Sequence, residues 1–503
     1  AAAARCRERL AAAGIDLAAY QSVASAADLD ELRQVLGYEA WNLYGISYGT
    51  RLALTALRET PTGIRSAILD SVYPPQVDGL ASLAPNTERV VTKLFADCQA
   101  DALCGTSFPD LEAAFYDVWA RANDRPFRVR VPHSDTGEML TLPVEGDDLV
   151  GMLFLAFYDA DLIPYLPLVI DQLAAGNEQV LVPLAHFTLS TYLQGSEGMS
   201  FSVNCHEEVP FNTPEEIAAA VQSVPPPMRA FAVTSTLEIC DLWGAGTPDA
   251  VETEPVTSDV PVLVLEGDYD PITPPAYGRS TAETLPNSYY FEFPGLGHGV
   301  TLADCPAEIA RDFVADPTTR PAAGCLSGMG PPDFVTESDL YLTSASYRIL
   351  IAFDSGASRL LVPLAAFVSG FALILVYVAL RALLRLFRIW PGSVPPGDGW
   401  FHGLLGVIAS LNLAFLAGLA ASIVGAMFGD WSILIFGLPS WAVAVLTIPV
   451  VSGLLALVLA GLLVVAWRRH HWSAARRVAY TVVWIGLAAF YPFLAYWDLL
   501  LGW

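Results

Sequence analysis

A serine flanked by two glycines is the most distinctive chemical feature of the sequence. Residues 45–49 read Gly-Ile-Ser-Tyr-Gly, with an apolar run over residues 40–44 before them and an amphipathic run over residues 51–57 after them. A strand, a sharp turn and a helix in this order predict a nucleophile elbow, which exposes the hydroxyl of Ser47 at the edge of a sheet. Both glycines are expected to remove β-carbons that would collide in the turn. The amide of Tyr48 is expected to point at a developing oxyanion.

An acid and a base that could complete a catalytic set follow this serine in the chain. Asp270 comes after the apolar run over residues 260–267, and His298 comes after the run over residues 288–293, in a glycine-rich loop. The order serine, aspartate, histidine is the one found in α/β-hydrolases. In such a set Ser47 attacks a carbonyl group, His298 takes and returns the proton, and Asp270 holds the imidazole.

The choice of the acid leaves alternatives. Asp268 and Asp70 also stand at the ends of predicted strands, and an aspartate at such a place is often a turn-capping residue. We favour Asp270 because the proline that follows it restricts the turn at the edge of the sheet. The base is better defined, since of the seven histidines only His298 follows a core strand within a glycine-rich loop.

The surrounding elements predict a doubly wound parallel sheet. A helix over residues 27–37 precedes the elbow strand, and a second strand is expected over residues 62–72, so strand, helix and strand form a parallel βαβ unit. From residue 76 to 259 the pattern changes to helices and loops, which predicts a lid over the site. The sheet then resumes, and this fold ends near residues 328–332. The lid helices are expected over residues 111–122, 149–157, 162–175 and 214–222.

Three motifs together resemble the secreted tripeptidyl-aminopeptidase and prolyl-aminopeptidase branch of the α/β-hydrolases. They are Gly-Ile-Ser-Tyr-Gly-Thr-Arg at residues 45–51, Gly-Asp-Tyr-Asp-Pro-Ile-Thr-Pro at residues 267–274 and Gly-Leu-Gly-His-Gly at residues 295–299. The likeness runs roughly from Cys6 to Cys325. It implies that the matching serine, aspartate and histidine are the triad, and that the protein releases residues from the free N-terminus of peptides.

The resemblance also points to acids in the lid that hold the α-ammonium group of the substrate. Glu207 and Glu208 are the candidates, because they follow Cys205 and His206 directly, and a carboxylate beside a cysteine cross-link would be rigidly placed to pair with a cation. The alternative is that these two glutamates are ordinary solvent-exposed acids of an acidic domain.

The cysteines indicate an oxidising compartment. All seven precede residue 330, and none stands in a Cys-x-x-Cys pair, so we expect neither a metal nor a cofactor. Cysteines of a domain that faces such a compartment pair with one another. The simplest hypothesis joins neighbours in sequence and leaves Cys6 alone. The expected pairs are Cys98–Cys104, Cys205–Cys240 and Cys305–Cys325.

The start of the sequence shows neither an initiating methionine nor a signal peptide. Fewer than 50 residues precede Ser47, which is too few for the earlier strands and the loop with the second oxyanion amide. We therefore expect that the sequence is a fragment and that any secretion signal lies in the missing part.

The last third of the chain predicts four membrane-spanning helices. Its uncharged runs cover residues 360–380, 403–429, 431–467 and 478–497, and a span needs about 20 residues. The third helix is expected to begin near Trp441, after a stretch that contains Pro439. Intramembrane Asp, Glu and Lys are lacking in these runs and polar residues such as Asn412 are few, which favours an anchor over a transporter.

Charge predicts the orientation of these helices and excludes one class of partner. Arginines follow the first span and lie between the third and fourth, while the loop between the second and third offers only Asp430, so the arginine-rich loops are expected inside. The arginines are Arg381, Arg385, Arg388, Arg468, Arg469, Arg476 and Arg477. The first 349 residues hold 18 basic and 48 acidic residues, and this negative charge argues against nucleic acid as a partner.

The sequence as a whole predicts a membrane-anchored, outward-facing serine hydrolase of multi-pass topology that acts on peptides. The alternatives are an esterase or lipase with the same triad, and a catalytically inactive hydrolase domain that serves as a binding module. The expected domains are the two parts of the hydrolase core (1–75 and 260–332), the lid (76–259), a linker (333–359) and the membrane region (360–503).

Overall fold

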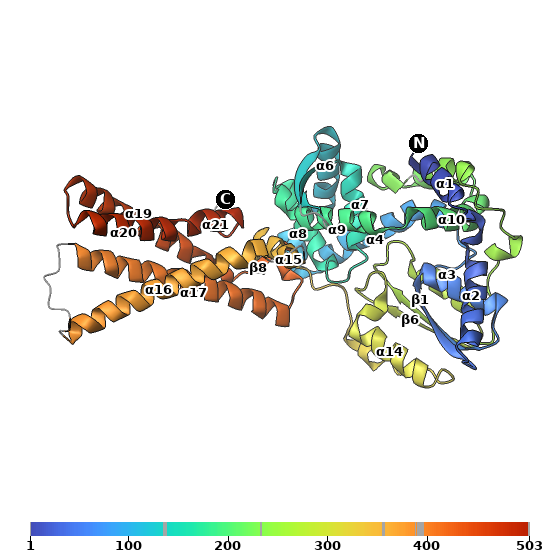
Figure 1. Ribbon diagram of the computed structural model, residues 1–503. Helices are drawn as coiled ribbons and strands as arrows, with labels where there is room; N and C mark the ends of the chain where they lie inside the picture. The colour runs from blue at the N-terminus through green and yellow to red at the C-terminus, as the bar shows by residue number, and fades with distance from the viewer. Residues whose placement is uncertain are drawn as a thin grey trace. The chain divides into compact units, whose positions relative to one another are not determined.

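The computed structural model describes residues 2–133, 138–231, 234–354, 358–387, 389 and 397–500 (Figure 1). The chain divides into two compact units. The first consists of Ala1–Val129, Thr141–Glu178 and Leu184–Val335, and the second of Arg130–Leu140, Gln179–Pro183 and Thr336–Trp503. Arg388, which contributes to the orientation prediction, lies outside the described residues, as do residues 501–503 of the predicted membrane region.

A parallel sheet forms the centre of the first unit, with four strands among the residues described, in the order β1-β2-β5-β6. The strands are β1 (Trp41–Ser47), β2 (Ile64–Val72), β5 (Val262–Gly267) and β6 (Ser288–Phe293). Each neighbouring pair is parallel. Helix α3 (Tyr48–Glu59) connects β1 to β2, so the βαβ unit and the α/β fold predicted from the sequence are confirmed. Because the strands are parallel, their carboxyl ends meet at one edge.

The two faces of this sheet bury alternate residues of the strands. On one face Leu69 and Val264 pack with Leu54 and Leu57 of α3. On the other face the strands pack against Phe313 of α14 (Asp304–Ala315), which carries residues that follow the histidine loop. In Figure 1, α2 and α3 lie beside β1, and α14 lies beside β6. Helices on both faces are the reason that β5 reads as a continuous apolar run.

Helices α1 (Ala2–Ala12) and α2 (Ser22–Val35) precede the sheet. Between β2 and β5 the lid contains mainly helices, as expected, and also a two-stranded sheet of β3 (Phe127–Pro132) and β4 (Met139–Val144) that the sequence analysis missed. Strand β3 alternates buried and exposed side chains, and this period of two was its signal. The lid helices are α4 (Gly79–Ala100), α5 (Ala102–Ser107), α6 (Leu111–Asp124), α7 (Gly146–Ala156), α8 (Leu166–Ala174), α9 (Leu181–Gln194), α10 (Glu197–Glu207), α11 (Pro214–Ser223) and α12 (Thr234–Trp243). Helix α13 (Pro275–Thr284) connects β5 to β6.

Disulfide bonds join the three pairs that sequence proximity suggested. The pairs are Cys98–Cys104, Cys205–Cys240 and Cys305–Cys325, with Cα–Cα distances of 5.1, 5.0 and 5.7 Å. Cys6 carries a free thiol and is partly buried. The second of these bonds joins α10 to α12, and α10 carries the two candidate glutamates at its end.

The second unit contains four helices, within its described part, that are long and apolar enough to cross a membrane. They are α16 (Ser358–Leu386), α17 (Asp398–Phe428), α19 (Ala442–Arg468) and the pair α20 (Ala474–Ala488) and α21 (Phe490–Tyr496). Trp441 is the residue before α19, where the third span was expected to begin. This unit also contains α15 (Ala345–Asp354), α18 (Ile433–Phe436) and the antiparallel strands β7 (Leu340–Leu342) and β8 (Gly437–Pro439).

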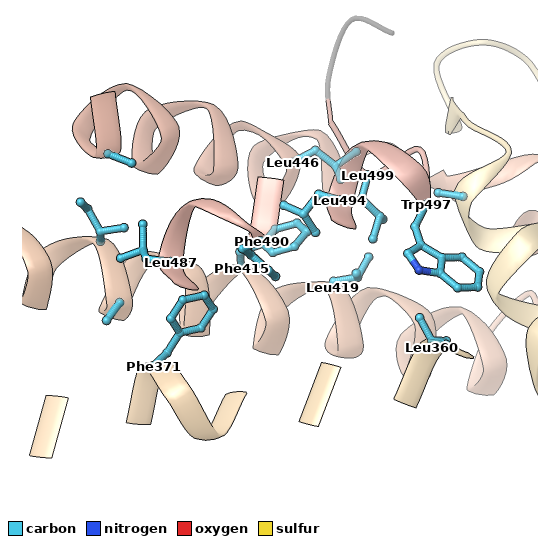
Figure 2. Packing of buried hydrophobic residues seen from close by; sticks show 14 of the residues in the cluster. Leu360, Phe371, Phe415, Leu419, Leu446, Leu487, Phe490, Leu494, Trp497 and Leu499 are labelled. Atoms are coloured by element: carbon cyan, nitrogen blue, oxygen red, sulfur yellow. The ribbon is translucent and has the colours of Figure 1, made fainter. Parts of the chain in front are cut away.

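An apolar core and a few buried polar side chains hold these helices together. Phe371, Phe415 and Phe490 come from three different helices and lie close to one another in Figure 2. The side chain of Ser452 donates a hydrogen bond to the amide oxygen of Asn412 over 2.7 Å, and Tyr491 donates to the hydroxyl of Ser452 over 3.1 Å. Hydrogen bonds of this kind between helices favour one arrangement of a membrane bundle over others.

Candidate active site

The backbone of Ser47 adopts the strained conformation that a nucleophile elbow requires. It has φ 58° and ψ −124° and stands between strand β1 and helix α3. A β-carbon on Gly45 would lie 2.2 Å from the carbonyl oxygen of Gly49, so this position admits only glycine. The prediction for Gly49 was wrong: a β-carbon there would meet nothing within 4 Å, because it would point into open space from the first turn of α3.

Tyr48 follows the serine as the first residue of α3. Its amide therefore lies at a helix N-terminus, where the peptide dipoles favour negative charge. Its hydroxyl lies 2.8 Å from the side-chain oxygen of Ser22, within hydrogen-bonding distance. Burial, together with the charge of Glu207, raises the pKa of Tyr48 to about 12. The side chain is thus held neutral and in place, while the role of the amide as an oxyanion donor stays a prediction.

The imidazole of His298 is bonded to the carboxylate of Asp270. Nδ1 of the histidine lies 2.7 Å from Oδ2 of the aspartate, which is fully buried. The other carboxylate oxygen accepts hydrogen bonds from the amides of Ile272 and Thr273 at 2.9 and 2.8 Å, and the hydroxyl of Thr273 donates to Oδ2 over 2.7 Å. Burial alone would raise the pKa of Asp270, but His298 and these donors lower it below its ordinary value. The turn after this aspartate therefore holds a charged carboxylate against the imidazole.

The surroundings of His298 favour its protonated form. Burial disfavours the imidazolium, but the carboxylate of Asp270 and the more distant charge of Asp70 outweigh it and raise the pKa of His298. The ring of Tyr158, from the lid, lies with its centroid 4.5 Å from that of the imidazole. The backbone oxygen of Tyr158 also accepts a hydrogen bond from the amide of His298 over 3.2 Å. The lid thus contacts the catalytic candidate directly, which the sequence did not reveal.

The two alternative acids have other partners. Asp268 forms an ion pair with Lys93 over 3.0 Å and accepts a hydrogen bond from the amide of Gly295 over 2.8 Å. The carboxylate of Asp70 accepts hydrogen bonds from the backbone amides of Val300 and Thr301, which follow His298 in the chain. Of the three aspartates at strand ends, all within the described part of the chain, it is Asp270 whose carboxylate bonds the imidazole.

Arg89, on lid helix α4, is a further residue that the sequence analysis missed. Its guanidinium donates hydrogen bonds to the backbone oxygens of Asp268, over 2.8 Å, and of Asp270. The arginine therefore holds the backbone of residues 268–270 in place through its bonds to these two carbonyl oxygens. A lone arginine in a long amphipathic helix gives no signal of such a role.

Glu207 and Glu208 share one buried arginine. Nε of Arg51 lies 3.1 Å from the carboxylate of Glu207, and its Nη1 forms an ion pair with Glu208. All three side chains are almost fully buried, so the alternative that these glutamates are solvent-exposed is wrong. A single guanidinium is thus shared by two buried carboxyl groups.

The two glutamates differ in what they can still bind. The carboxylate of Glu207 accepts hydrogen bonds from the amide and the hydroxyl of Ser22, at 2.5 and 3.0 Å, and so holds the first residue of helix α2 as well as pairing with Arg51. Glu208 lines a cavity next to Ser47. Burial raises the pKa of Glu208, although Arg51 and a hydrogen bond from Tyr73 oppose this effect.

The cavity beside Ser47 has a volume of about 440 Å³. Its walls come from the elbow, from the start of α4, from one face of α10 and from the turn after Asp270. Apart from Glu208 its lining is mostly apolar or uncharged, with polar groups at the serine and along α10. The lining residues are Ser47, Tyr48, Tyr73, Gly79, Leu80, Leu83, Ser196, Met199, Ser200, Val203, Asn204, Glu208, Ile272 and Thr273.

Comparison with known families agrees with this geometry. A family model described as alpha/beta hydrolase fold matches residues 6–96, which include the elbow. A model described as TAP-like protein matches residues 226–325, which include Asp270 and His298.

Among characterised proteins, the chain is similar to the serine protease Hip1 of Mycobacterium tuberculosis and of Mycobacterium bovis. The identity is 24% over 331 residues, and the alignment covers 61% of this chain and 61% of the relative. The match thus spans less than two thirds of those relatives. Solved structures with weaker likeness include an esterase from Thermogutta terrifontis (17% identity, TM-score 0.25, 59% of this chain and 74% of that one). Another is the esterase EaEST from Exiguobacterium antarcticum (13% identity, TM-score 0.27, 61% and 76%).

Proposed function

We propose, since the chain is an α/β-hydrolase of the TAP-like family, that it is a serine peptidase that releases residues from the free N-terminus of peptides. Ser47, His298 and Asp270 form its triad. The observation that carries this proposal is the 2.7 Å bond between the imidazole and the buried aspartate, at the sheet edge where the strained serine also stands.

The geometry supports a mechanism through an acyl-enzyme. The hydroxyl oxygen of Ser47 attacks the carbonyl carbon of the scissile bond while Nε2 of His298 takes the proton. The oxyanion that forms accepts a hydrogen bond from the amide of Tyr48. His298 then returns the proton to the leaving amine, and the carbon–nitrogen bond breaks. Water, activated by the same imidazole, hydrolyses the acyl-enzyme, and Asp270 stabilises the imidazolium in both halves.

Glu208 is the residue that we assign to the α-ammonium group of the substrate. It lines the cavity beside the serine, and it shares the guanidinium of Arg51 with Glu207. An ammonium group in the cavity would favour the ionised form of the Glu208 carboxyl group and pair with it in a weakly polar environment. Glu207 pairs with Arg51 and binds the first residue of α2, and so positions its neighbour rather than binding the ammonium itself.

The walls of the cavity favour an apolar side chain close to that ammonium group. Leu80, Leu83, Met199, Val203 and Ile272 line it, and burying one apolar side chain against such a surface contributes about 1.5–3 kcal/mol. Peptides that begin with apolar residues are thus the expected substrates.

The enzyme is anchored by its four apolar helices, with the hydrolase on the extracytoplasmic side. Disulfides in the first unit agree with an oxidising compartment. The arginines near the end of α16, at the end of α19 and at the start of α20 agree with cytoplasmic loops at these helix ends.

A labelling experiment tests the proposal. The full chain is treated with a fluorophosphonate beside Ser47→Ala, and is then assayed on peptide amides with free or acetylated N-termini and on short-chain esters. We expect the wild type to be labelled and Ser47→Ala not to be labelled. We also expect the wild type to cleave only the substrates with a free N-terminus. Absence of labelling would indicate an inactive binding module, and cleavage restricted to esters would indicate an esterase.

A further inference from the structure

Two residues just before the end of strand β2 bind the loop that carries the candidate base. The carboxylate of Asp70 accepts hydrogen bonds from the amides of Val300 and Thr301, at 2.8 and 3.0 Å, and from the hydroxyl of Thr301 at 2.5 Å. The hydroxyl of Ser71 accepts a hydrogen bond from the amide of Gly299 over 2.8 Å. Three successive amides directly after His298 are thus held by two neighbouring side chains.

The position of these two side chains is determined by an unusual backbone. Ser71 has φ 58°, a left-handed conformation that is uncommon for residues other than glycine. Asp70 and Ser71 are both fully buried, so their bonds to the loop do not compete with water. A strained, buried residue that persists at a strand end is held there by its surroundings, and such residues cluster at functional sites.

We propose that Asp70 is a positioning residue for His298, which it serves in two ways. Its hydrogen bonds fix residues 300 and 301 of the loop and with them the imidazole, and its negative charge adds to that of Asp270 in stabilising the imidazolium. The site therefore contains two carboxylates, one that contacts the imidazole and one that acts through the backbone and through space. This inference rests on the proposed role of His298 as the base.

Four other titratable groups lie around Asp70 and His298 and could add charge there. They are Tyr44, Tyr158, Glu266 and Asp270. Burial raises the pKa of both tyrosines, which keeps them neutral at ordinary pH. Burial also holds the pKa of Glu266 well above its usual range, and its carboxyl accepts a hydrogen bond from the amide of Val72 over 3.1 Å. Burial raises the pKa of Asp70 as well, but the hydrogen bonds from Thr301 and Val300 and the charge of His298 oppose this effect. Asp70 and Asp270 are thus the carboxylates that act on the imidazole.

The test measures the pH dependence of fluorophosphonate labelling of Ser47 in the full chain, because this readout needs no knowledge of the substrate. In Asp70→Asn we expect the apparent midpoint of labelling to fall by about 0.5–1 pH unit, since a nearby negative charge is lost. The plateau rate should fall about 10- to 100-fold because the imidazole is less well placed. The matched control Ser71→Ala removes the hydrogen bond from Gly299 and the longer bond of 3.3 Å from Ser71 to Asp70. The charge of Asp70 stays, so the rate should fall while the midpoint is unchanged.

An unchanged midpoint in folded Asp70→Asn would overturn the electrostatic role, and an unchanged plateau would overturn the positioning role. If Asp70→Asn does not fold, Asp70→Glu keeps the charge and displaces the carboxylate by one methylene. The expected result is then a midpoint close to that of the wild type with a reduced plateau, and a wild-type plateau would contradict the proposal. A wild-type chain that is not labelled at all would instead overturn the triad, so the two failures are distinguishable.

Discussion

His298 is the residue whose titration should determine the pH range of activity. Its imidazole must be neutral to accept the proton of Ser47, and burial lowers its pKa less than the two neighbouring carboxylates raise it. Activity should therefore be present above this raised pKa and be lost as the pH falls through it. We expect kcat/KM to rise with pH through a midpoint above about 6.5, the ordinary value for histidine.

The variant Asp270→Asn checks this assignment. Removing the bonded carboxylate should move the midpoint down and lower kcat on the order of 10³- to 10⁴-fold, because the imidazolium loses its stabilising partner. The matched control Asp268→Asn removes a carboxylate that pairs with Lys93 and should leave the midpoint in place. A larger effect of the control than of Asp270→Asn would show that the acid was assigned wrongly.

Glu208 and Glu207 offer a second matched pair at the scale of single residues. In Glu208→Gln we expect KM for peptides with a free N-terminus to rise about 10- to 100-fold, because a charge-assisted contact contributes about 1.5–3 kcal/mol. The same variant should treat acetylated or ester substrates as the wild type does. Glu207→Gln should lower thermal stability more than it changes this selectivity, since Glu207 pairs with Arg51 and binds Ser22 at the start of α2. Equal effects of Glu208→Gln on free and blocked substrates would contradict the ammonium site.

The elbow is the element where local geometry is most demanding. Gly45→Ala should destabilise the fold by about 1–3 kcal/mol, because its β-carbon would overlap the backbone oxygen of Gly49. Gly49→Ala should be close to neutral, since open space surrounds that position and its φ is not positive. Thermal unfolding of both variants, followed by labelling of Ser47 at low temperature, checks the difference. Similar melting temperatures would mean that the elbow adjusts to a side chain at Gly45.

At the scale of the whole molecule, the prediction concerns topology. In a Cys6→Ser background the remaining six cysteines are paired, so a single introduced cysteine reports its own side of the membrane. We expect a membrane-impermeant maleimide to label Phe428→Cys, at the end of α17, in intact cells. His471→Cys, between α19 and α20, should be labelled only after the cells are opened. The reverse pattern would contradict the extracytoplasmic assignment.

Much of the fold and part of the site were predictable from the sequence because their signals are local. The glycines around Ser47, the apolar run of β5 and the turn after Asp270 each reflect the conformation of a few consecutive residues. The four apolar helices are equally local, since about 20 uncharged residues in a row have few alternatives to a membrane. The pairing of the cysteines was only the simplest hypothesis from proximity along the chain, and the structure confirms it.

The tertiary structure decided which distant side chains meet. Arg51 and Glu208 are separated by 157 residues, and Asp70 and Val300 by 230, so no pattern along the chain connects them. The sequence drew attention to the segments around these four residues, but it did not show which of them contact one another. A buried charged group pairs with whichever partner the packing of the elements brings near it. The physical reason is that turns and periodicity encode elements locally, whereas the desolvation of a charge is settled only when elements pack.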